Sequence, residues 1–191
     1  MSNFNNLLKP RIVNIENISL NNTKVTLEPL ERGFGHTLGS ALRRIMLSSI
    51  VGSSVTEVSI EGVQHEYSTI EGIQEDVIDI MLNLKEVSFR MNGNSGATLS
   101  LSKNEVGPVT ASDIELKGDI EIVNPEHVIA NITTKGASIN MQIEVSEGIG
   151  YSSASQRKDD VNRIVGSLLI DASYSPIKKV SYKAVSYTHL T

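Results

Sequence analysis

The chain has no cysteine among its 191 residues, which excludes a disulfide framework, a thiolate metal site and a cysteine nucleophile. It also has no apolar run close to the ~18–20 residues that a bilayer-spanning helix needs. The first residues, MSNFNNLLKPR, lack the basic and then apolar pattern of a secretion signal. We therefore expect a cytoplasmic protein that does not enter a membrane.

Basic residues are few for a domain that binds nucleic acid. Lysine and arginine number 17 against 22 aspartates and glutamates, so the formal net charge is −5. A chain that mainly bound phosphates would need a basic face, so we expect no direct DNA contact. With 39% hydrophobic and 20% charged residues, the composition is that of a globular protein, and the length suffices for one large domain or two small ones.

Two segments have the apolar periodicity of helices. From Leu38 to Ser49, apolar residues recur at helical spacing after Thr37, which is a suitable N-cap. From about Glu71 to Leu84, a second apolar stripe follows an acidic first turn, which complements the positive end of the helix dipole. The sequence therefore predicts one helix over each of these segments.

Most of the remaining chain alternates like β-strands. Residues 24–28 alternate up to Pro29, which cannot donate to a ladder and should end the strand. Residues 148–162 begin with glycine and serine and are expected to form a surface loop. Other predicted strands are 55–63, 87–91, 97–101, 119–123, 128–132, 138–145, 167–170 and 178–182. This order predicts an α+β fold, with mostly antiparallel strands and two helices, and not a βαβ alternation.

No pattern of residues predicts catalysis or a bound cofactor. Gly33, Gly35 and Gly39 have the wrong spacing for a dinucleotide loop and no βαβ context. The histidines have no metal-ligand spacing; they are His36, His65, His127 and His189. We expect no catalytic residue, no metal and no cofactor in this chain.

Arg43 and Arg44 lie beside the apolar stripe of the first predicted helix. A solvated rim is the general explanation of such a pair. Alternatively, the helix packs on a partner chain and the arginines meet partner carboxylates or carbonyls, since arginine is enriched at interface hot spots. The residues by themselves leave both alternatives open.

Several long motifs, in one order, closely resemble the α subunit of bacterial RNA polymerase. The longest stretches include LEPLERGFGHTLGSALRRI and HEYST. The resemblance runs from about Leu7 to Lys183 and so covers nearly the whole chain. It is carried by residues 8–11, 26–45, 65–69, 71–77, 82–85, 107–111 and 171–176.

This resemblance implies a non-catalytic subunit on which RNA polymerase is assembled. Two copies of the family's α subunit dimerise and recruit the β and β′ subunits, which hold the catalytic centre for DNA-templated transcription. The family fold implies a dimerisation domain, here residues 1–51 plus 177–184, and an inserted strand-rich domain over residues 52–176. Such a chain is part of a nucleotidyltransferase in the bacterial cytoplasm, associated with the nucleoid.

The resemblance also implies which residues meet which partner. The dimer interface would be formed by Phe34 and, on the first helix, by Leu38, Leu42, Ile45 and Met46. The residues implied to contact the β subunit are Arg44, Leu47, His65, Glu66 and Tyr67. Those implied to contact β′ are Lys85 and Ile170, which without the resemblance would be interpreted as a helix end and a residue of a core strand.

The chain departs from the family pattern at its end. The family continues with a second long dimerisation helix and a separate DNA-contacting domain, so we expect a C-terminally truncated α subunit. Residues 185–191 resemble a translated adapter and are interpreted as a non-native tail. The competing hypotheses are an independent enzyme, which needs an acid, a base and a nucleophile in one pocket, and a DNA-binding module, which needs steeply salt-dependent duplex binding.

Overall fold

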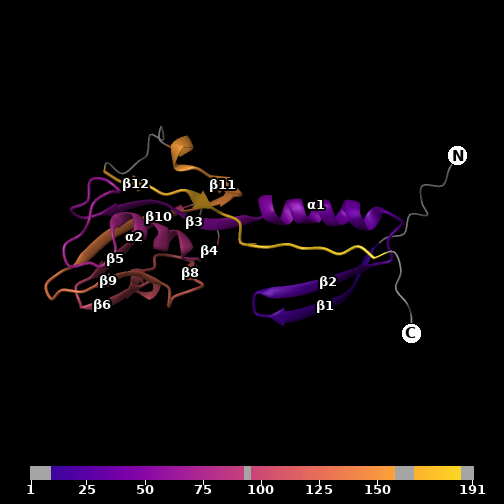
Figure 1. The fold of residues 1–191 in the computed structure, drawn as a ribbon, viewed down its shortest axis with the longest axis horizontal. Helices are drawn as coiled ribbons and strands as arrows, with labels where there is room; N and C mark the ends of the chain where they lie inside the picture. Colours follow the sequence, from indigo (N-terminus) through magenta and orange to yellow (C-terminus); the bar gives the residue numbers. More distant parts are fainter. Residues whose placement is uncertain (1–9, 93–95, 158–165, 186–191) are drawn as a thin grey trace. The chain divides into compact units, whose positions relative to one another are not determined.

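A computed structural model describes residues 10–92, 96–157 and 166–185. The chain divides into two compact units: one contains the residues up to Met46 and those from Lys179 on, and the other spans Leu47–Lys178. Two α-helices accompany strands that pair antiparallel throughout the described part of the chain (Figure 1). The predicted α+β class with a strand-rich inserted domain is therefore confirmed.

The first unit contains a β-hairpin. β1 (Arg11–Ser19) pairs with β2 (Asn22–Glu28), and Ile15 faces Val25 across the hairpin. β2 ends immediately before Pro29, as the sequence predicts, because proline has no N–H to donate to a ladder.

The first helix, α1 (Phe34–Ser48), begins earlier than predicted. The prediction of Thr37 as the N-cap is wrong, since that residue lies one turn inside the helix. Gly33, with a φ of +86°, turns the chain directly into the helix, and the Phe34 N–H donates to the Glu31 carbonyl at 3.0 Å. Glycine adopts this positive φ without steric cost. The tight turn at Gly33 therefore leads directly into the first residue of the helix, Phe34.

The prediction of a strand over residues 178–182 is wrong. This segment has no regular secondary structure, and Figure 1 shows residues 179–184 running alongside α1. Gly39 of α1 admits the Tyr182 ring, since a Cβ on this glycine would lie 2.4 Å from it. The alternating pattern of the segment therefore reflects packing on a helix and not pairing in a sheet.

The second unit is built on a sheet of seven strands. Its order is β7–β5–β10–β3–β4–β8, and β12 pairs with another part of β3. The two longest strands, β3 (Val51–Ile60) and β10 (Ile139–Ile149), pair with each other at its centre. The others are β4 (Phe89–Met91), β5 (Gly96–Lys103), β7 (Ile114–Glu115), β8 (Ile120–Ile122) and β12 (Leu168–Leu169). Separate pairs are formed by β6 (Gly107–Thr110) with β9 (Val128–Ile132), and by β11 (Tyr151–Ser152) with β13 (Ala172–Ser173).

The core of the second unit joins this sheet to the second helix, α2 (Val77–Glu86). The apolar stripe predicted for this helix supplies buried side chains to the core, namely Val77, Ile80 and Leu84. Alternate residues of β10 are buried from Ile139 to Val145, as the period of two predicts. Each side chain of this size that is fully buried contributes roughly 1.5–3 kcal/mol to the hydrophobic stabilisation of the fold.

The second helix begins later than the predicted start near Glu71. Asp76 is its N-cap, and the carboxylate accepts a hydrogen bond from the Asp79 N–H at 2.8 Å. The residues before it bind β9 instead, since the Gln74 N–H donates to the Asn131 carbonyl at 3.0 Å. This backbone group already has a tertiary partner, so the helical ladder does not extend over it.

The prediction of a surface loop over residues 148–162 is partly wrong. β10 continues to Ile149, and Gly150, with a φ of +68°, turns the chain into β11. A short 3₁₀ helix then follows over Ala154–Arg157. Residues 158–162 lie outside the described part of the chain.

Tyr174 packs on the two central strands where two glycines face each other. Gly52 of β3 and Gly148 of β10 are direct partners in the ladder. A Cβ on Gly148 would lie 2.6 Å from the Tyr174 ring, and a Cβ on Gly52 would lie 1.8 Å from the Tyr174 carbonyl oxygen. The Tyr174 hydroxyl forms a hydrogen bond with Ser146 Oγ at 2.9 Å. The two missing side chains therefore make the space in which the returning chain packs on the sheet.

Substitution of Gly52 tests this close approach. We expect Gly52→Ala to lower the free energy of unfolding by about 3 kcal/mol, at the upper end of ordinary overpacking costs, because the obstacle is a backbone carbonyl. Urea unfolding followed by circular dichroism measures the loss. Gly96→Ala is the matched control, since its Cβ would meet only the Val145 carbonyl at 3.4 Å. Equal losses for the two variants would contradict the argument.

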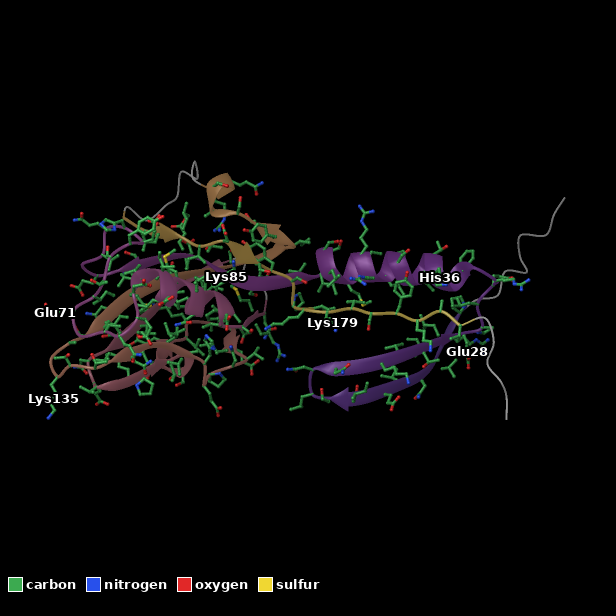
Figure 2. All side chains as sticks on the ribbon, viewed as in Figure 1. Glu28, His36, Glu71, Lys85, Lys135 and Lys179 are labelled. Atoms are coloured by element: carbon green, nitrogen blue, oxygen red, sulfur yellow. The ribbon has the colours of Figure 1, made fainter. Side chains whose placement is uncertain are left out.

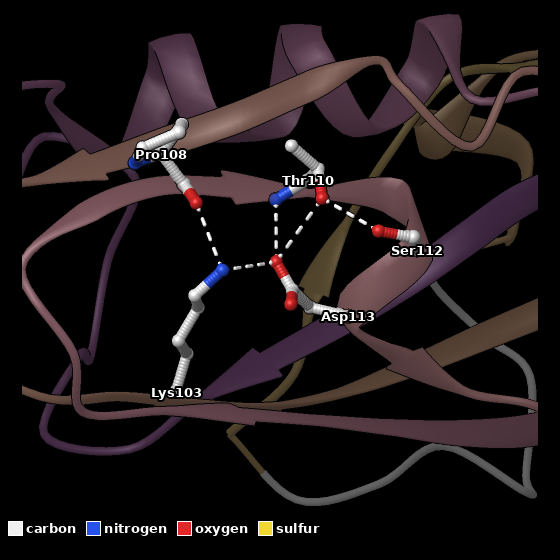
Figure 3. A network of polar contacts seen from close by, with 5 residues as sticks. All are labelled: Lys103, Pro108, Thr110, Ser112 and Asp113. Carbon is white, nitrogen blue, oxygen red and sulfur yellow. Dashed lines mark hydrogen bonds and ion pairs between the residues drawn. The ribbon is translucent and has the colours of Figure 1, made fainter.

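A polar network fixes the chain between β6 and β7 (Figure 3). Lys103 Nζ donates to Asp113 Oδ2 at 2.7 Å and to the Pro108 carbonyl at 2.9 Å. The Thr110 N–H donates to the same carboxylate oxygen at 2.8 Å. Burial by itself raises the pKa of Asp113, but the hydrogen bonds from Lys103 and Thr110 and the Lys103 charge hold that pKa below its usual value of 3.8.

This lowered pKa predicts how the stability depends on pH. A carboxylate whose pKa is lower in the folded chain stabilises the fold above its unfolded pKa, and this contribution is lost as the pH falls through the folded pKa. Asp113→Asn should therefore lower the free energy of unfolding by about 1 kcal/mol at pH 7. Below about pH 4, the stability of this variant should fall less steeply with decreasing pH than that of the unsubstituted chain. Urea unfolding at several pH values measures both effects.

The exposed ion pair between Arg90 and Glu121 supplies the control for this experiment. Its atoms are 3.1 Å apart, and its side chains are 63% and 64% exposed. Surface pairs of this kind contribute roughly 0–1 kcal/mol, so Glu121→Gln should change stability little at any pH. A pH profile of Asp113→Asn that coincides with that of the unsubstituted chain would contradict the role of the network.

Candidate subunit-contact surfaces

The apolar face of α1 is only partly covered in the first unit. No residue of α1 is buried, and the side chains of Phe34 and Ile45 are 52% and 53% exposed. Leu38, Leu42 and Met46 are half-buried. These five residues recur at helical spacing, so they form one stripe along the helix. We call them the α1 stripe.

The two residues of α1 implied to contact β lie on another side of the helix. Arg44 is exposed and Leu47 is half-buried. Residues three apart are neighbours on a helix surface, and the 100° turn per residue places this pair away from the α1 stripe. One helix therefore carries two different faces.

The other residues implied to contact β lie in a short connector of the second unit. His65, Glu66 and Tyr67 are all exposed, and Tyr67 is 77% exposed. The connector is held by Ser68, whose Oγ donates to the His65 carbonyl at 2.6 Å and whose carbonyl accepts from the Val77 N–H at 3.2 Å. These bonds present three polar and aromatic side chains to solvent on an ordered backbone.

The segment after this connector is tied to β9 by a carboxylate. Glu75 accepts hydrogen bonds from the Asn131 N–H at 2.6 Å and from Asn131 Nδ2 at 2.7 Å. Gly72, with a φ of +81°, passes so close to Ala137 that a Cβ would lie 2.5 Å from its methyl group. Glu75 lies inside the helix that the sequence predicts from about Glu71 to Leu84, and the structure instead gives it this anchoring role.

Lys85, one of the two residues implied to contact β′, lies in the last turn of α2 (Figure 2). Its Nζ lies 6.0 Å from the centre of the Tyr151 ring, which is a cation–π distance. Tyr151 is 61% exposed although β11 pairs it with Ser173. The structure thus places an exposed aromatic ring beside the predicted contact residue.

Ile170, the other residue implied to contact β′, is a core residue with 4% exposure. Its N–H donates to the Thr56 carbonyl at 2.9 Å, and its carbonyl accepts a hydrogen bond from Arg157 Nη2. Arg157 Nη1 donates to the Thr56 carbonyl at 3.1 Å. The Ile170 side chain is therefore not offered to a partner in this structure, whereas its neighbour Asp171 lies next to Tyr151.

The Tyr151 hydroxyl and the Asp171 carboxylate influence each other's pKa. The neighbouring carboxylate, as an acceptor and as a negative charge, raises the pKa of Tyr151. The hydrogen bond from the Ala154 N–H, at 2.8 Å, and the Tyr151 hydroxyl lower the pKa of Asp171, and the charge of Lys85 lowers it further. Lys85 and the segment that follows Ile170 therefore meet at one tyrosine, although 85 residues separate them.

Sequence reasoning missed Tyr151, Asp171 and Arg157 as members of this group. Tyr151 lay in the segment predicted to be a loop, where an exposed aromatic residue carries no periodic signal. Only the pairing of β11 with β13 brings the three residues together, and no spacing in the sequence announces that pairing.

The histidines do not gather into a site. His36 lies edge-on to Tyr182, with ring centres 6.3 Å apart, and His127 Nε2 forms a hydrogen bond with the Asn83 carbonyl at 3.0 Å. His189 lies outside the described residues. Over residues 10–92, 96–157 and 166–185, no three histidine, aspartate or glutamate side chains are arranged to hold a metal ion. None of the described helices is long and apolar enough to cross a membrane.

These features together define a class of protein. A strand-rich domain presents ordered, exposed side chains on several surfaces, and the second helix and the sheet hold them in place. This arrangement is typical of a subunit that binds other proteins. The model of the RNA polymerase Rpb3/RpoA insert domain family matches residues 58–175, which is more than half of the chain.

The chain therefore belongs to the RNA polymerase Rpb3/RpoA insert domain family. It is an RNA polymerase subunit of the α/Rpb3 type, part of a nucleotidyltransferase complex and assembled with other polymerase subunits.

Proposed function

We propose that this chain is a bacterial α-type subunit that forms a homodimer and then recruits the β and β′ subunits of RNA polymerase. The observation that carries the proposal is the partly exposed α1 stripe in a member of a polymerase subunit family. The chain acts as a scaffold, and the catalytic groups belong to its partners. The sequence resemblance supports a bacterial assignment, a C-terminally truncated chain and the domain boundaries given above.

Exposure of the first unit supports the dimer. Ile15 and Val25 are 57% and 51% exposed on one face of the hairpin, and the α1 stripe adds two large apolar side chains that are more than half exposed. Several large apolar side chains exposed along one face of an element are characteristic of protein–protein interfaces. A second copy offers an identical apolar stripe, so a two-fold interface can cover both stripes at once.

The polar side of α1 supports a separate contact with β. Arg44 is a rigid five-donor group on the side of the helix that the α1 stripe leaves open. The connector that holds His65, Glu66 and Tyr67 supplies further exposed groups of the kind that interfaces use. Two faces with different chemistry allow the dimer to form before the larger subunits bind.

The dimer is tested by placing a charge in the α1 stripe. We expect Ile45→Glu to convert a dimer into a monomer, because a buried unpaired carboxylate is strongly unfavourable at an interface. Size-exclusion chromatography with light scattering measures the mass of each form. Ser40→Glu is the control on the opposite side of the same helix. A monomeric mass for the unsubstituted chain, or a dimer that survives Ile45→Glu, would contradict the proposal.

Recruitment of β is tested by removing one guanidinium. We expect Arg44→Ala to weaken binding of a bacterial β subunit about tenfold or more, as for an interface hot spot, while the dimer mass stays unchanged. Co-elution of the chain with β, followed by titration, measures the affinity. Arg43→Ala is the matched control, since it removes the adjacent exposed arginine on a different side of the helix. Equal binding by the Arg44→Ala variant would eliminate this contact.

A further inference from the structure

We infer that Tyr151 is the anchor of the surface around Lys85, and that this surface receives a partner segment in which a carboxylate lies beside an apolar side chain. The inference rests on the proposed function, which places a β′-type subunit at Lys85. It adds a contact residue and the chemistry of the partner.

Tyr151 is exposed and yet held from two sides. Asp171 lies near enough to the hydroxyl to raise the pKa of Tyr151, and Lys85 Nζ lies 6.0 Å from the ring centre. The backbone of Tyr151 is fixed by its pairing with Ser173 in β13. An exposed side chain that moves freely loses conformational freedom when a partner binds, which weakens the binding. A ring that is already held avoids most of this loss, and preorganised tyrosines are frequent hot spots.

Exposed apolar residues occur close to Tyr151 and Lys85 along the chain. Val51 and Ile149 are direct partners at the ends of β3 and β10, and each is 55% exposed. Ile149 precedes Tyr151 by two residues, and Leu82, also 55% exposed, precedes Lys85 by one turn of α2. An apolar side chain of a partner can therefore pack here next to the tyrosine ring.

The charge of Lys85 selects an acidic partner. Asp171 is engaged by the Ala154 N–H and by the Tyr151 hydroxyl. Within the described residues, no carboxylate lies at ion-pair distance from Lys85 Nζ. The Lys85 ammonium group therefore retains N–H donors for a partner carboxylate. The Tyr151 ring on one side of the ammonium group limits the directions from which that carboxylate can approach.

The test uses the full chain bound to a bacterial β subunit and then titrated with β′. We expect Tyr151→Ala to weaken β′ binding about tenfold or more, while binding of β and the circular dichroism spectrum stay unchanged. Tyr151→Phe keeps the ring and loses the hydroxyl beside Asp171, so its effect should be smaller, about threefold. Leu116→Ala is the control, since it removes an exposed apolar side chain that follows β7 at the edge of the sheet and should leave the β′ step unchanged.

A salt titration tests the acidic partner. Binding of β′ to the unsubstituted chain should weaken as ionic strength rises, and Lys85→Gln should flatten this dependence. A benzophenone side chain introduced at position 151 should crosslink to β′ and not to β.

The possible failures can be distinguished. If the unsubstituted chain with β does not bind β′, the proposed function fails and the inference fails with it. If that complex binds β′ and Tyr151→Ala binds it equally well, only the anchor is overturned. Crosslinking to β, or equal loss of β′ binding in Leu116→Ala, would also overturn the anchor. An unchanged salt dependence in Lys85→Gln would overturn the acidic partner.

Discussion

The second unit depends on the close approach of Tyr174 to two facing glycines, Gly52 and Gly148. A side chain at either glycine would collide with the tyrosine, so the central ladder and the returning chain can pack only as they do. The same return carries β13, which pairs with β11 and so fixes Tyr151 beside Lys85. A packing constraint in the centre of the sheet therefore determines the geometry of a surface site.

The alternation of apolar residues predicted the strands well because this sheet buries every second side chain, as β10 does from Ile139 to Val145. Helix boundaries were less predictable. α2 begins only at Val77 because Gln74 and Glu75 bind Asn131, which lies 56 residues away from Glu75. Residues 178–182 alternate like a strand and yet pack on α1. Periodicity shows which side of a segment is apolar. Whether that segment then forms a helix, a strand or an irregular stretch depends on the elements against which it packs.

The candidate contact residues follow from the resemblance to the α subunit, because charge and apolar periodicity do not single them out. Arg44 and Lys85 are ordinary surface cations in the sequence, and only family motifs give them partners. The structure then alters the group around Lys85. Ile170 is buried and holds the return strand to Thr56, whereas Tyr151, which has no periodic signal, is exposed beside the lysine. The pairing of β11 with β13 brings the residues around Lys85 together. A single sequence does not show which distant strands pair, so this group could not be predicted.

Burial is distributed unequally between the two units, and this has a consequence for assembly. All buried hydrophobic side chains of the described residues lie between Val55 and Tyr174, and none lies on α1. The second unit therefore gains its hydrophobic stabilisation within one chain, whereas the first unit leaves such side chains as Phe34 and Ile45 in water. Binding that covers those side chains adds its free energy to the stability of the first unit by mass action. If the proposed dimer forms through these side chains, folding of the first unit is coupled to association.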